Sequence, residues 1–298
     1  MRILIAGRSG QLAQELASRL PRDGHAVTAL GQPELDLAAP ETVRRAVERV
    51  APEAIVNAAA YTAVDRAEDE REAAFAVNAA GAGALAAEAA RLGIPLLHVS
   101  TDYVFDGSKD APYTEEDATG PTGVYGASKL AGEEAVLRTH PRSVVLRTAW
   151  VCGVHGNNFL KTMLRLGAER PKLSVVADQH GAPTFTADIA EAIARMLPAL
   201  AEAPAGDPRF GVFHLSGAPY TTWHGFAAEI FRQAAARGHK VPELGAIGTA
   251  DYPTKARRPA NSRLDCRRIG QIHGIQPADW RQSLAQALEG LASSVPRG

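Results

Sequence analysis

Three side chains of this 298-residue chain have the types and spacing needed to reduce a carbonyl group. Tyr125 and Lys129 are four residues apart, so on a helix they lie on one face, one turn from each other. Tyrosine has a pKa of about 10, and a nearby ammonium group favours the phenolate and lowers that pKa. Thr101 follows the apolar run 95–100, which predicts a buried strand that ends at a ligand-binding edge. Together these groups would stabilise and then protonate an alkoxide.

The Tyr-x-x-x-Lys spacing also occurs by chance, as a solvated pair on a helix surface. The amino terminus strengthens the catalytic interpretation. A strand-like segment, residues 2–6, precedes Gly7-Arg-Ser-Gly10-Gln-Leu-Ala13, and a helical pattern follows. In a dinucleotide-binding turn, the first glycine makes the turn, the second admits the pyrophosphate and the third small residue lets helix and sheet pack closely. We therefore predict cofactor contacts from Gly7, Arg8, Gly10, Gln11 and Leu12 at a helix amino terminus, with an ordinary strand–helix turn as the alternative.

The next segments bear on which cofactor binds. The second predicted strand, residues 26–30, is followed by Gly31 and Gln32 and not by the carboxylate that would bond the ribose 2′-hydroxyl of NAD. Arg8 lies within the glycine turn, and arginine suits a 2′-phosphate. These features predict NADPH; the alternatives are NADH and an Arg8 that is merely exposed. Asp36 and Leu37 begin the following loop, and we expect them near the adenine.

Strands alternate with helices through the first half of the chain. Further strands are predicted at 54–57, 95–100 and 143–147, and helices at 41–50, 68–92 and 125–138. This alternation predicts a Rossmann-type, doubly wound parallel sheet with helices on both faces. The third strand ends in the small residues Ala58, Ala59 and Ala60, followed by Tyr61, which leaves room for a flat cofactor or else serves tight packing.

The second half predicts a smaller α/β domain. It has helices at 159–168, 186–200 and 222–237, a strand at 210–215, a turn-rich loop at 178–184 and a last helix from Trp280. Asn158 is a good helix N-cap that could also hold a phosphate. The basic loop 252–262 contains Arg258, which would clamp an anionic group unless the loop is only solvated surface. We assign 1–150 to a cofactor domain, to which 186–216 return, and 151–298 mainly to a substrate domain.

Composition excludes several classes of partner. A net charge of −1 and a balanced pI of about 6.8 give no general attraction to nucleic acid or anionic membranes. Cys152 and Cys266 form neither a disulfide framework nor a zinc spacing. We see no signal peptide and no apolar run near the 18 or so residues that span a bilayer. We expect a cytoplasmic protein with a small-molecule substrate, without nucleic-acid or membrane partners.

The chain resembles the extended short-chain dehydrogenase/reductases, and within them the dTDP-4-dehydrorhamnose reductases. The resemblance covers nearly the whole chain and rests on six motifs in order: Gly7-Arg-Ser-Gly-Gln-Leu12, Asn57-Ala-Ala-Ala-Tyr-Thr-Ala-Val-Asp65, Ser100-Thr-Asp-Tyr-Val-Phe105, Arg147-Thr-Ala-Trp-Val151, Asp178-Gln-His-Gly-Ala-Pro-Thr184 and Arg258-Pro-Ala-Asn-Ser262.

The resemblance implies reduction of the C4 ketone of dTDP-4-dehydro-6-deoxy-L-mannose by NADPH to give dTDP-L-rhamnose. It implies that Tyr125 donates a proton to the C4 oxygen, that Thr101 polarises the ketone, and that Lys129 holds the nicotinamide ribose and lowers the pKa of Tyr125. The positions that match the family's sugar site are Val64, Tyr103 and Trp150, and we also expect Asp102, Asn158 and Arg258 to contact substrate.

The chain departs from the family pattern at several positions. Ala13 replaces a glycine and Cys152 a frequent tyrosine. Some members form a dimer through Mg²⁺ held by acidic residues; Glu15 matches one ligand, whereas Ala187 stands where another acid is expected, beside Asp188. The sequence therefore leaves Mg²⁺ a weak expectation, and the choice between monomer and homodimer open.

Three alternative functions share these features. A nucleotide-sugar 4,6-dehydratase would need a glutamate directly after Asp102, where this chain has Tyr103. A related ketoreductase could act on another sugar or nucleotide. A non-catalytic regulatory subunit would keep the cofactor site, but here Thr101, Tyr125 and Lys129 are all present.

Overall fold

A six-stranded parallel sheet forms the centre of the protein in a computed structural model that describes residues 1–293. Its strand order is β10-β5-β4-β3-β1-β2. The strands are β1 (Arg2–Ala6), β2 (Ala26–Leu30), β3 (Ala54–Asn57), β4 (Leu96–Thr101), β5 (Ser143–Thr148) and β10 (Gly211–His214). The doubly wound Rossmann-type sheet predicted from the sequence is therefore confirmed.

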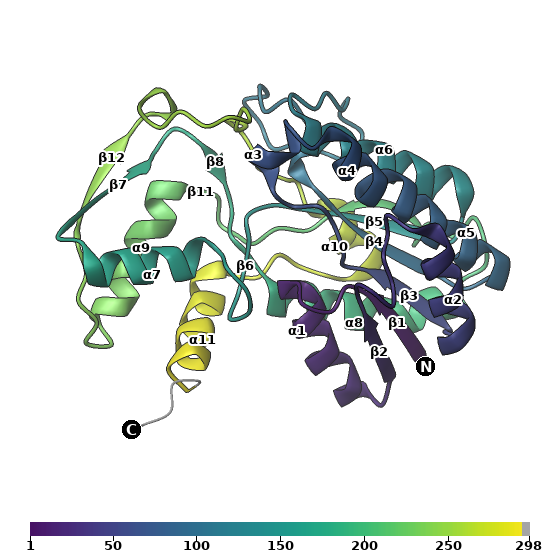
Figure 1. The fold of residues 1–298 in the computed structure, drawn as a ribbon. Helices are drawn as coiled ribbons and strands as arrows, with labels where there is room; N and C mark the ends of the chain where they lie inside the picture. The colour runs from purple at the N-terminus through teal and green to yellow at the C-terminus, as the bar shows by residue number, and fades with distance from the viewer. Residues whose placement is uncertain (294–298) are drawn as a thin grey trace.

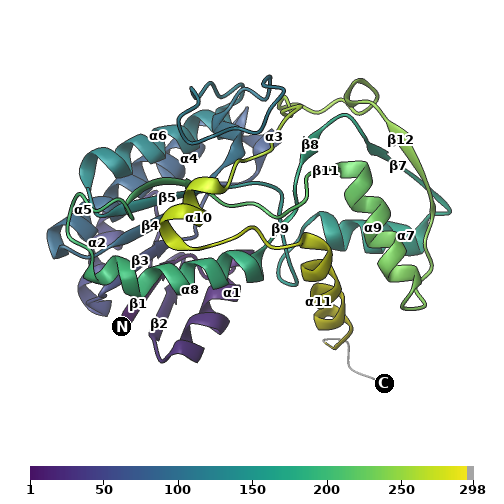
Figure 2. The same ribbon diagram turned by 180° about the vertical axis from the view of Figure 1, so that it is seen from behind.

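Helices cover both faces of the sheet (Figures 1 and 2). Successive residues of β1 point to opposite faces: Ile3 joins the core under α1 (Gln11–Arg19) and α8 (Thr186–Glu202), and Leu4 joins the other core. On that second face lie α2 (Pro40–Val50), α5 (Ala82–Leu92) and α6 (Val124–Thr139). Because both faces are buried, the strands are continuous apolar runs, which explains why the sequence revealed them.

The order of the strands fixes where a ligand can bind. The chain passes from β1 to β2 on one side and then to β3 on the other side of β1. In open α/β sheets this change of direction opens a crevice at the carboxyl ends of the strands. Gly7 and Ala58, which directly follow β1 and β3, both lie at this edge.

A later part of the chain returns to the sheet. Strand β10 pairs with β5 from Gly211–Val144 to His214–Arg147, and α8 packs against α1. The short helix α10 (Arg267–His273) packs on β10.

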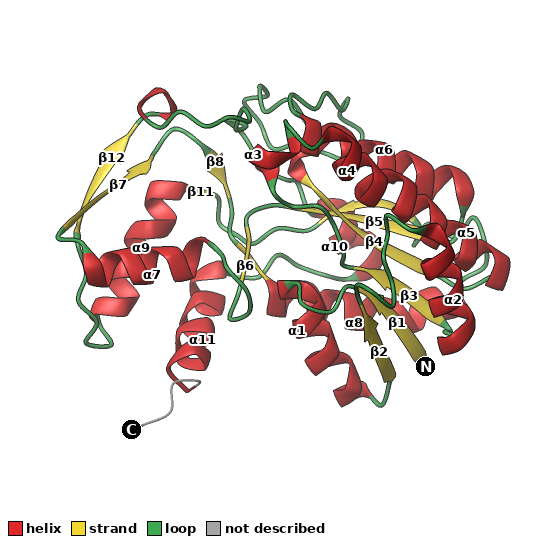
Figure 3. Ribbon diagram, viewed as in Figure 1, coloured by secondary structure: helices red, strands yellow, loops and turns green. Residues whose placement is uncertain are grey.

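The rest of the second half forms a smaller α/β unit, seen to the left of the sheet in Figure 3. Its helices are α7 (Phe159–Glu169), α9 (Trp223–Ala235) and α11 (Trp280–Ser293). Strands β7 (Lys172–Val176) and β12 (Glu243–Ile247) pair in parallel. Four further short strands form two pairs: β6 (Val151–Cys152) with β9 (Thr184–Phe185), and β8 (His180–Gly181) with β11 (Thr221–Thr222). A separate apolar core, including Leu160, Phe226 and Trp280, holds the unit together.

The long helix expected at 68–92 is broken into shorter pieces. Helix α3 (Val64–Ala67) is separate, α4 (Arg71–Phe75) follows, and a π-helical segment, η2 (Ala76–Gly81), leads into α5. The wider turn of η2 places the side-chain amide of Asn78 so that it accepts a hydrogen bond from the backbone N–H of Tyr61 and donates one to the Tyr61 carbonyl. Helix propensity alone does not show such a long-range polar contact. Strands β7 and β12 and helix α10 were not predicted from the sequence either.

The helical stretch Arg71–Leu92 is long and apolar enough, by length and composition, to cross a membrane. The sequence was expected to contain no apolar run of that length. Core helices of soluble proteins meet the same criterion, and this stretch packs against α2 and α6 over the sheet.

A buried ion pair fastens α6 to the sheet. Glu133 and Arg147, with side chains 2% and 6% exposed, approach to 2.7 Å, and Glu133 also accepts a hydrogen bond from Ser100. Glu133 lies one helical turn after Lys129. The pair therefore joins β4 and β5 to the helix that carries Tyr125 and Lys129.

We expect Glu133→Ala to lower the free energy of unfolding by about 3–5 kcal/mol, because it leaves Arg147 charged and unpaired in the interior. Urea unfolding followed by circular dichroism measures the change. Glu134→Ala is the matched control, since the neighbouring Glu134 is exposed. Equal, small losses in the two variants would contradict this role for the pair.

Candidate active site

Tyr125 and Thr101 come together at the carboxyl edge of the sheet. Thr101 ends β4, and Tyr125 lies in the first turn of α6. The next residue, Gly126, packs so closely on the carbonyl of Tyr103 that a side chain would collide with it. This contact brings α6 against the short helix η3 (Asp102–Val104), and the rings of Tyr103 and Tyr125 meet edge to face at 5.4 Å.

The environment of Tyr125 raises its pKa. Removal of the phenol from water is the main cause, and a hydrogen bond with Thr101 opposes it. The sequence predicted the opposite direction, because it placed the ammonium of Lys129 beside the phenol. For the free protein that prediction is wrong: desolvation outweighs the helical spacing, and the head group of Lys129 is bonded elsewhere.

Lys129 is buried and not a solvated partner of Tyr125. It is 2% exposed, and its Nζ donates a 2.7 Å hydrogen bond to the carbonyl of Val99. His98 Nε2 lies 3.5 Å from the same Nζ. Burial lowers the pKa of Lys129 to about 8, and the negative charge of Glu133 partly opposes this change.

Asp102 is a buried carboxyl group with one free oxygen. Its Oδ1 accepts a 3.0 Å hydrogen bond from the Thr101 hydroxyl, and its Oδ2 has no partner among the described residues. Burial raises the pKa of Asp102 to about 6. The donor that we expected to polarise a ketone is thus bonded to Asp102 in the free protein.

The glycine turn has the geometry that a dinucleotide requires. Gly7 has φ +118°, which favours glycine, and a Cβ there would lie 3.3 Å from the Cβ of Ala13. At Gly10 a Cβ would meet nothing closer than 3.9 Å, and Gly10 begins α1 without a side-chain cap. The first amides of α1, at Gln11 and Leu12, have no intrahelical partner and no side-chain cap from Gly10, so they are available to bind an anion such as a pyrophosphate.

Arg8 has a carboxylate partner that the sequence did not reveal. Its guanidinium lies 3.3 Å from Glu34 and donates a 2.9 Å hydrogen bond to the Gln32 carbonyl. The loop after β2 brings Glu34 back over the glycine turn. An acid of the kind that can bond a ribose 2′-hydroxyl and an arginine of the kind that can bond a 2′-phosphate therefore lie together here.

The other predicted cofactor positions divide into two groups. Ala58, Ala59 and Ala60 follow β3 at the carboxyl edge of the sheet and are partly buried, whereas the hydroxyl of Tyr61 donates to Glu70 at 2.6 Å. In the loop after β2, the Asp36 carboxylate accepts from the Ala38 amide, and the Leu37 side chain is buried in the core. For Leu37, only the backbone can contact a cofactor.

Asn158 spans the two parts of the molecule. Its Oδ1 caps α7 by accepting from the amide of Lys161, as the sequence predicted, and its Nδ2 donates to Gln11 Oε1 at 2.8 Å. The same nitrogen also bonds the carbonyl of Gly153. Both polar atoms of Asn158 are therefore occupied within the protein, and a phosphate would have to displace one of these bonds.

Trp150 has a strained backbone and an aromatic partner. Its φ is +49°, unusual for a bulky residue, and its ring stacks on Trp223 with centroids 3.8 Å apart. Gly181 also lies against the indole, where a Cβ would come within 2.6 Å of the ring. Trp223 was not predicted, since it is distant in sequence. Val64, at the start of α3, is partly buried.

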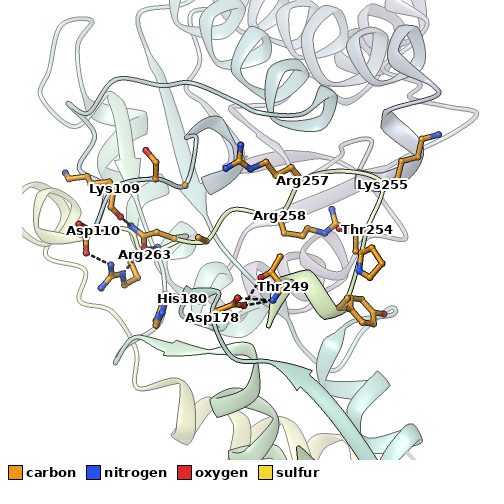
Figure 4. Close-up of a pocket in the computed structure, with 16 residues that line it drawn as sticks. Lys109, Asp110, Asp178, His180, Thr249, Thr254, Lys255, Arg257, Arg258 and Arg263 are labelled. Atoms are coloured by element: carbon orange, nitrogen blue, oxygen red, sulfur yellow. Dashed lines mark hydrogen bonds between the residues drawn. The ribbon is translucent and has the colours of Figure 1, made fainter. Parts of the chain in front are cut away.

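Arg258 borders a large basic pocket. The pocket has a volume of about 730 Å³, and Figure 4 shows basic side chains reaching it from several segments. The Arg258 guanidinium is 2.5 Å from Asp65, hydrogen-bonds Tyr103 and keeps one nitrogen without a partner. Because Tyr103 touches Tyr125, Arg258 connects the pocket to the candidate catalytic residues. The other charged or aromatic lining residues are Lys109, Asp110, Asp178, His180, Tyr252, Lys255, Arg257 and Arg263.

Glu15 does not belong to a metal site in the described part of the chain. Its carboxylate lies 3.4 Å from the Thr186 hydroxyl and 3.7 Å from His155. Asp188 accepts a hydrogen bond from Ser283 instead. Within residues 1–293 no three acidic, histidine or cysteine side chains group as metal ligands.

Comparison with known proteins identifies relatives over the full length. The family model described as the RmlD substrate binding domain matches residues 1–293. A dTDP-4-dehydrorhamnose reductase of Sinorhizobium fredii is 46% identical over 286 residues, covering 95% of both chains.

Solved structures agree with this assignment. The crystal structure of a dTDP-4-dehydrorhamnose reductase from Clostridium acetobutylicum is 35% identical, with a TM-score of 0.91, covering 98% of this chain and 100% of that one. The Bacillus anthracis enzyme in complex with NADP is 34% identical, with a TM-score of 0.89, covering 97% and 99%.

Proposed function

The chain belongs to the RmlD substrate binding domain family, and from that membership we propose that it is a dTDP-4-dehydrorhamnose reductase. It would use NADPH to reduce the C4 ketone of dTDP-4-dehydro-6-deoxy-L-mannose, giving dTDP-L-rhamnose. The observation that supports this proposal best is the meeting of Thr101 and Tyr125 at the edge of the sheet that carries the glycine turn.

NADPH, when bound, supplies the hydride. We assign its pyrophosphate to the amides of Gln11 and Leu12 beside Gly10, and its 2′-phosphate to Arg8. The domain assignment follows from these contacts: residues 1–150 with 186–216 hold the cofactor, and the rest mainly hold the nucleotide sugar.

The catalytic residues would act on the C4 oxygen of the sugar. The Thr101 hydroxyl exchanges its bond with Asp102 for one with that oxygen, which stabilises the developing negative charge. Tyr125 then donates its proton to the same oxygen. Its raised pKa keeps the phenol protonated at neutral pH. We infer that the positive charge of the buried Lys129, one helical turn away, stabilises the phenolate left behind.

The nucleotide part of the substrate carries two phosphates, which suits the basic pocket. We assign Arg258 to bind them, because it borders the pocket and hydrogen-bonds Tyr103, and we assign Val64 and Trp150 to the sugar. Arginine binds phosphate through paired, charge-assisted hydrogen bonds. In the free protein Arg258 is paired with Asp65, and the diphosphate would replace Asp65 as its partner.

A dehydratase is less consistent with the site. Elimination needs a base beside Asp102, but the next residue is Tyr103, whose pKa is raised to about 12 by burial. Tyr103 therefore keeps its proton at neutral pH.

The direct test incubates the protein with NADPH and dTDP-4-dehydro-6-deoxy-L-mannose, follows NADPH consumption and determines the C4 configuration of the product by NMR. The proposal predicts dTDP-L-rhamnose. No NADPH consumption by folded protein, or the C4 epimer as product, would refute it.

Tyr125→Phe should bind NADPH normally but lose about 10²–10⁴ in kcat, the usual size of a general-acid effect. Stopped-flow turnover and fluorescence titration with NADPH measure the two quantities. Tyr113→Phe is the matched control, because Tyr113 is a buried tyrosine whose hydroxyl bonds Asp106 and not Thr101. Turnover of Tyr125→Phe at the wild-type rate would eliminate the proton-donor role.

Variants of Arg8 and Glu34 should change cofactor preference in opposite directions. Arg8→Gln removes the cation and should raise KM for NADPH more than for NADH. Glu34→Gln releases Arg8 from its ion pair and should lower KM for NADPH relative to NADH. Steady-state kinetics with both cofactors give the ratio, and an unchanged ratio in both variants would reject the 2′-phosphate contact.

Arg258→Ala should weaken dTDP binding by about 1.5–3 kcal/mol, the value of a hydrogen bond to a charged group. Isothermal titration calorimetry with dTDP measures this loss. Arg267→Ala serves as the control, since Arg267 pairs with Asp265 outside the pocket. Equal affinities for the two variants would show that Arg258 has only a structural role.

A further inference from the structure

Three buried polar side chains form a row that begins at the candidate catalytic residue Lys129. Lys129 on α6, His98 on β4 and Asn57 at the end of β3 are each at most 2% exposed. His98 Nδ1 is 2.9 Å from Asn57 Nδ2, and His98 Nε2 is 3.5 Å from Lys129 Nζ. The reaction described above gives His98 and Asn57 no part.

The hydrogen bonds of Asn57 determine the tautomer of His98. Asn57 Oδ1 accepts the amide of Ala59 at 3.2 Å, so the side-chain nitrogen faces His98 Nδ1 as a donor. A neutral imidazole has one donor and one acceptor nitrogen. Since Nδ1 accepts from Asn57, Nε2 carries the proton and points it at Lys129.

His98 stays neutral in this position. Burial is the main cause that holds its pKa well below the usual value, and the charge of Lys129 adds to it. A protonated His98 would also leave Nδ1–H facing the Asn57 nitrogen, donor against donor. The imidazole therefore keeps the single Nε2–H arrangement across the neutral pH range.

The Nε2–H donor of His98 disfavours the charged form of Lys129. An ammonium group has three donors and no acceptor, whereas a neutral amine has a lone pair that can accept Nε2–H. The separation of 3.5 Å exceeds the usual 2.7–3.2 Å of a hydrogen bond, as expected where two donors meet.

The other groups around Lys129 also affect the balance between its ammonium and neutral amine forms. From its own helix, Glu133 favours the ammonium, but Arg147 of β5 and Ser100 of β4 bond that carboxylate. The carbonyl of Val99 accepts one of the three N–H groups. His98 is the described neighbour whose hydrogen bond would favour the uncharged amine.

We propose that His98, held as the Nε2–H tautomer by Asn57, is a positioning residue that weakens the hold of Lys129 on its proton and so sets the pH above which turnover falls. The proposal rests on the proposed reductase function, in which the Lys129 ammonium stabilises the Tyr125 phenolate. Since burial lowers the pKa of Lys129 to about 8, the loss of activity is expected near that pH, as Lys129 becomes neutral.

The pH dependence of kcat tests the proposal in His98→Gln. Glutamine can turn its side-chain oxygen toward Lys129 and accept a hydrogen bond from the ammonium. The alkaline limb of the profile, where kcat falls as the pH rises, should therefore move to a higher pH by about one unit. His214→Gln is the matched control: His214 is also a fully buried strand histidine, bonded to the Tyr113 carbonyl, and its variant should leave the limb in place. NADPH titration shows that each variant is folded and binds cofactor; His98→Asn replaces His98→Gln if that variant does not fold.

A measurement on the wild-type protein tests the tautomer without any substrate. Long-range ¹H–¹⁵N correlation NMR should show His98 protonated on Nε2 at pH 7, and protonation on Nδ1 would overturn the proposal. So would an unshifted alkaline limb in folded, active His98→Gln. Wild-type protein that consumes no NADPH would instead refute the reductase function, while the tautomer result would still decide the hydrogen bonding of His98.

Discussion

The attachment of α6 to β4 and β5 is the constraint on which the candidate site depends. Lys129 bonds the Val99 carbonyl of β4, Glu133 pairs with Arg147 of β5, and Gly126 lets the helix approach Tyr103. All three contacts lie on the buried side of one helix. Together they fix Tyr125 beside Thr101 at the edge of the sheet, within reach of a cofactor on the glycine turn.

The free protein pairs its ligand-binding groups with one another. Arg8 is paired with Glu34, Arg258 with Asp65, and the Thr101 hydroxyl with Asp102. Each ligand must therefore exchange one hydrogen bond for another, and the net gain is the difference between the two. Such exchange favours selectivity, because a ligand that lacks the matching phosphate or carbonyl leaves the original pair intact.

Burial, more than local charge, governs the titration of the site. Desolvation raises the pKa of Tyr125 and of Asp102 and lowers that of Lys129, so each of these groups is moved toward its neutral form. A neutral phenol is the form that donates a proton to an alkoxide. The same burial makes the remaining neighbours of Lys129, including His98, effective in setting its charge.

The sequence alone determined the strands of the six-stranded sheet, the glycine turn and the identity of the candidate residues, because apolar runs, glycine spacing and helical periodicity are local properties. It predicted Tyr125 and Lys129 on one face of a helix, the cap at Asn158 and the return of a late strand. Only the tertiary structure decided the direction of the Tyr125 pKa shift, the pairing of Arg8 with Glu34, the stacking of Trp150 on Trp223 and the row from Lys129 to Asn57. These depend on burial and on contacts between distant segments, and the spacing of residues along a chain records neither.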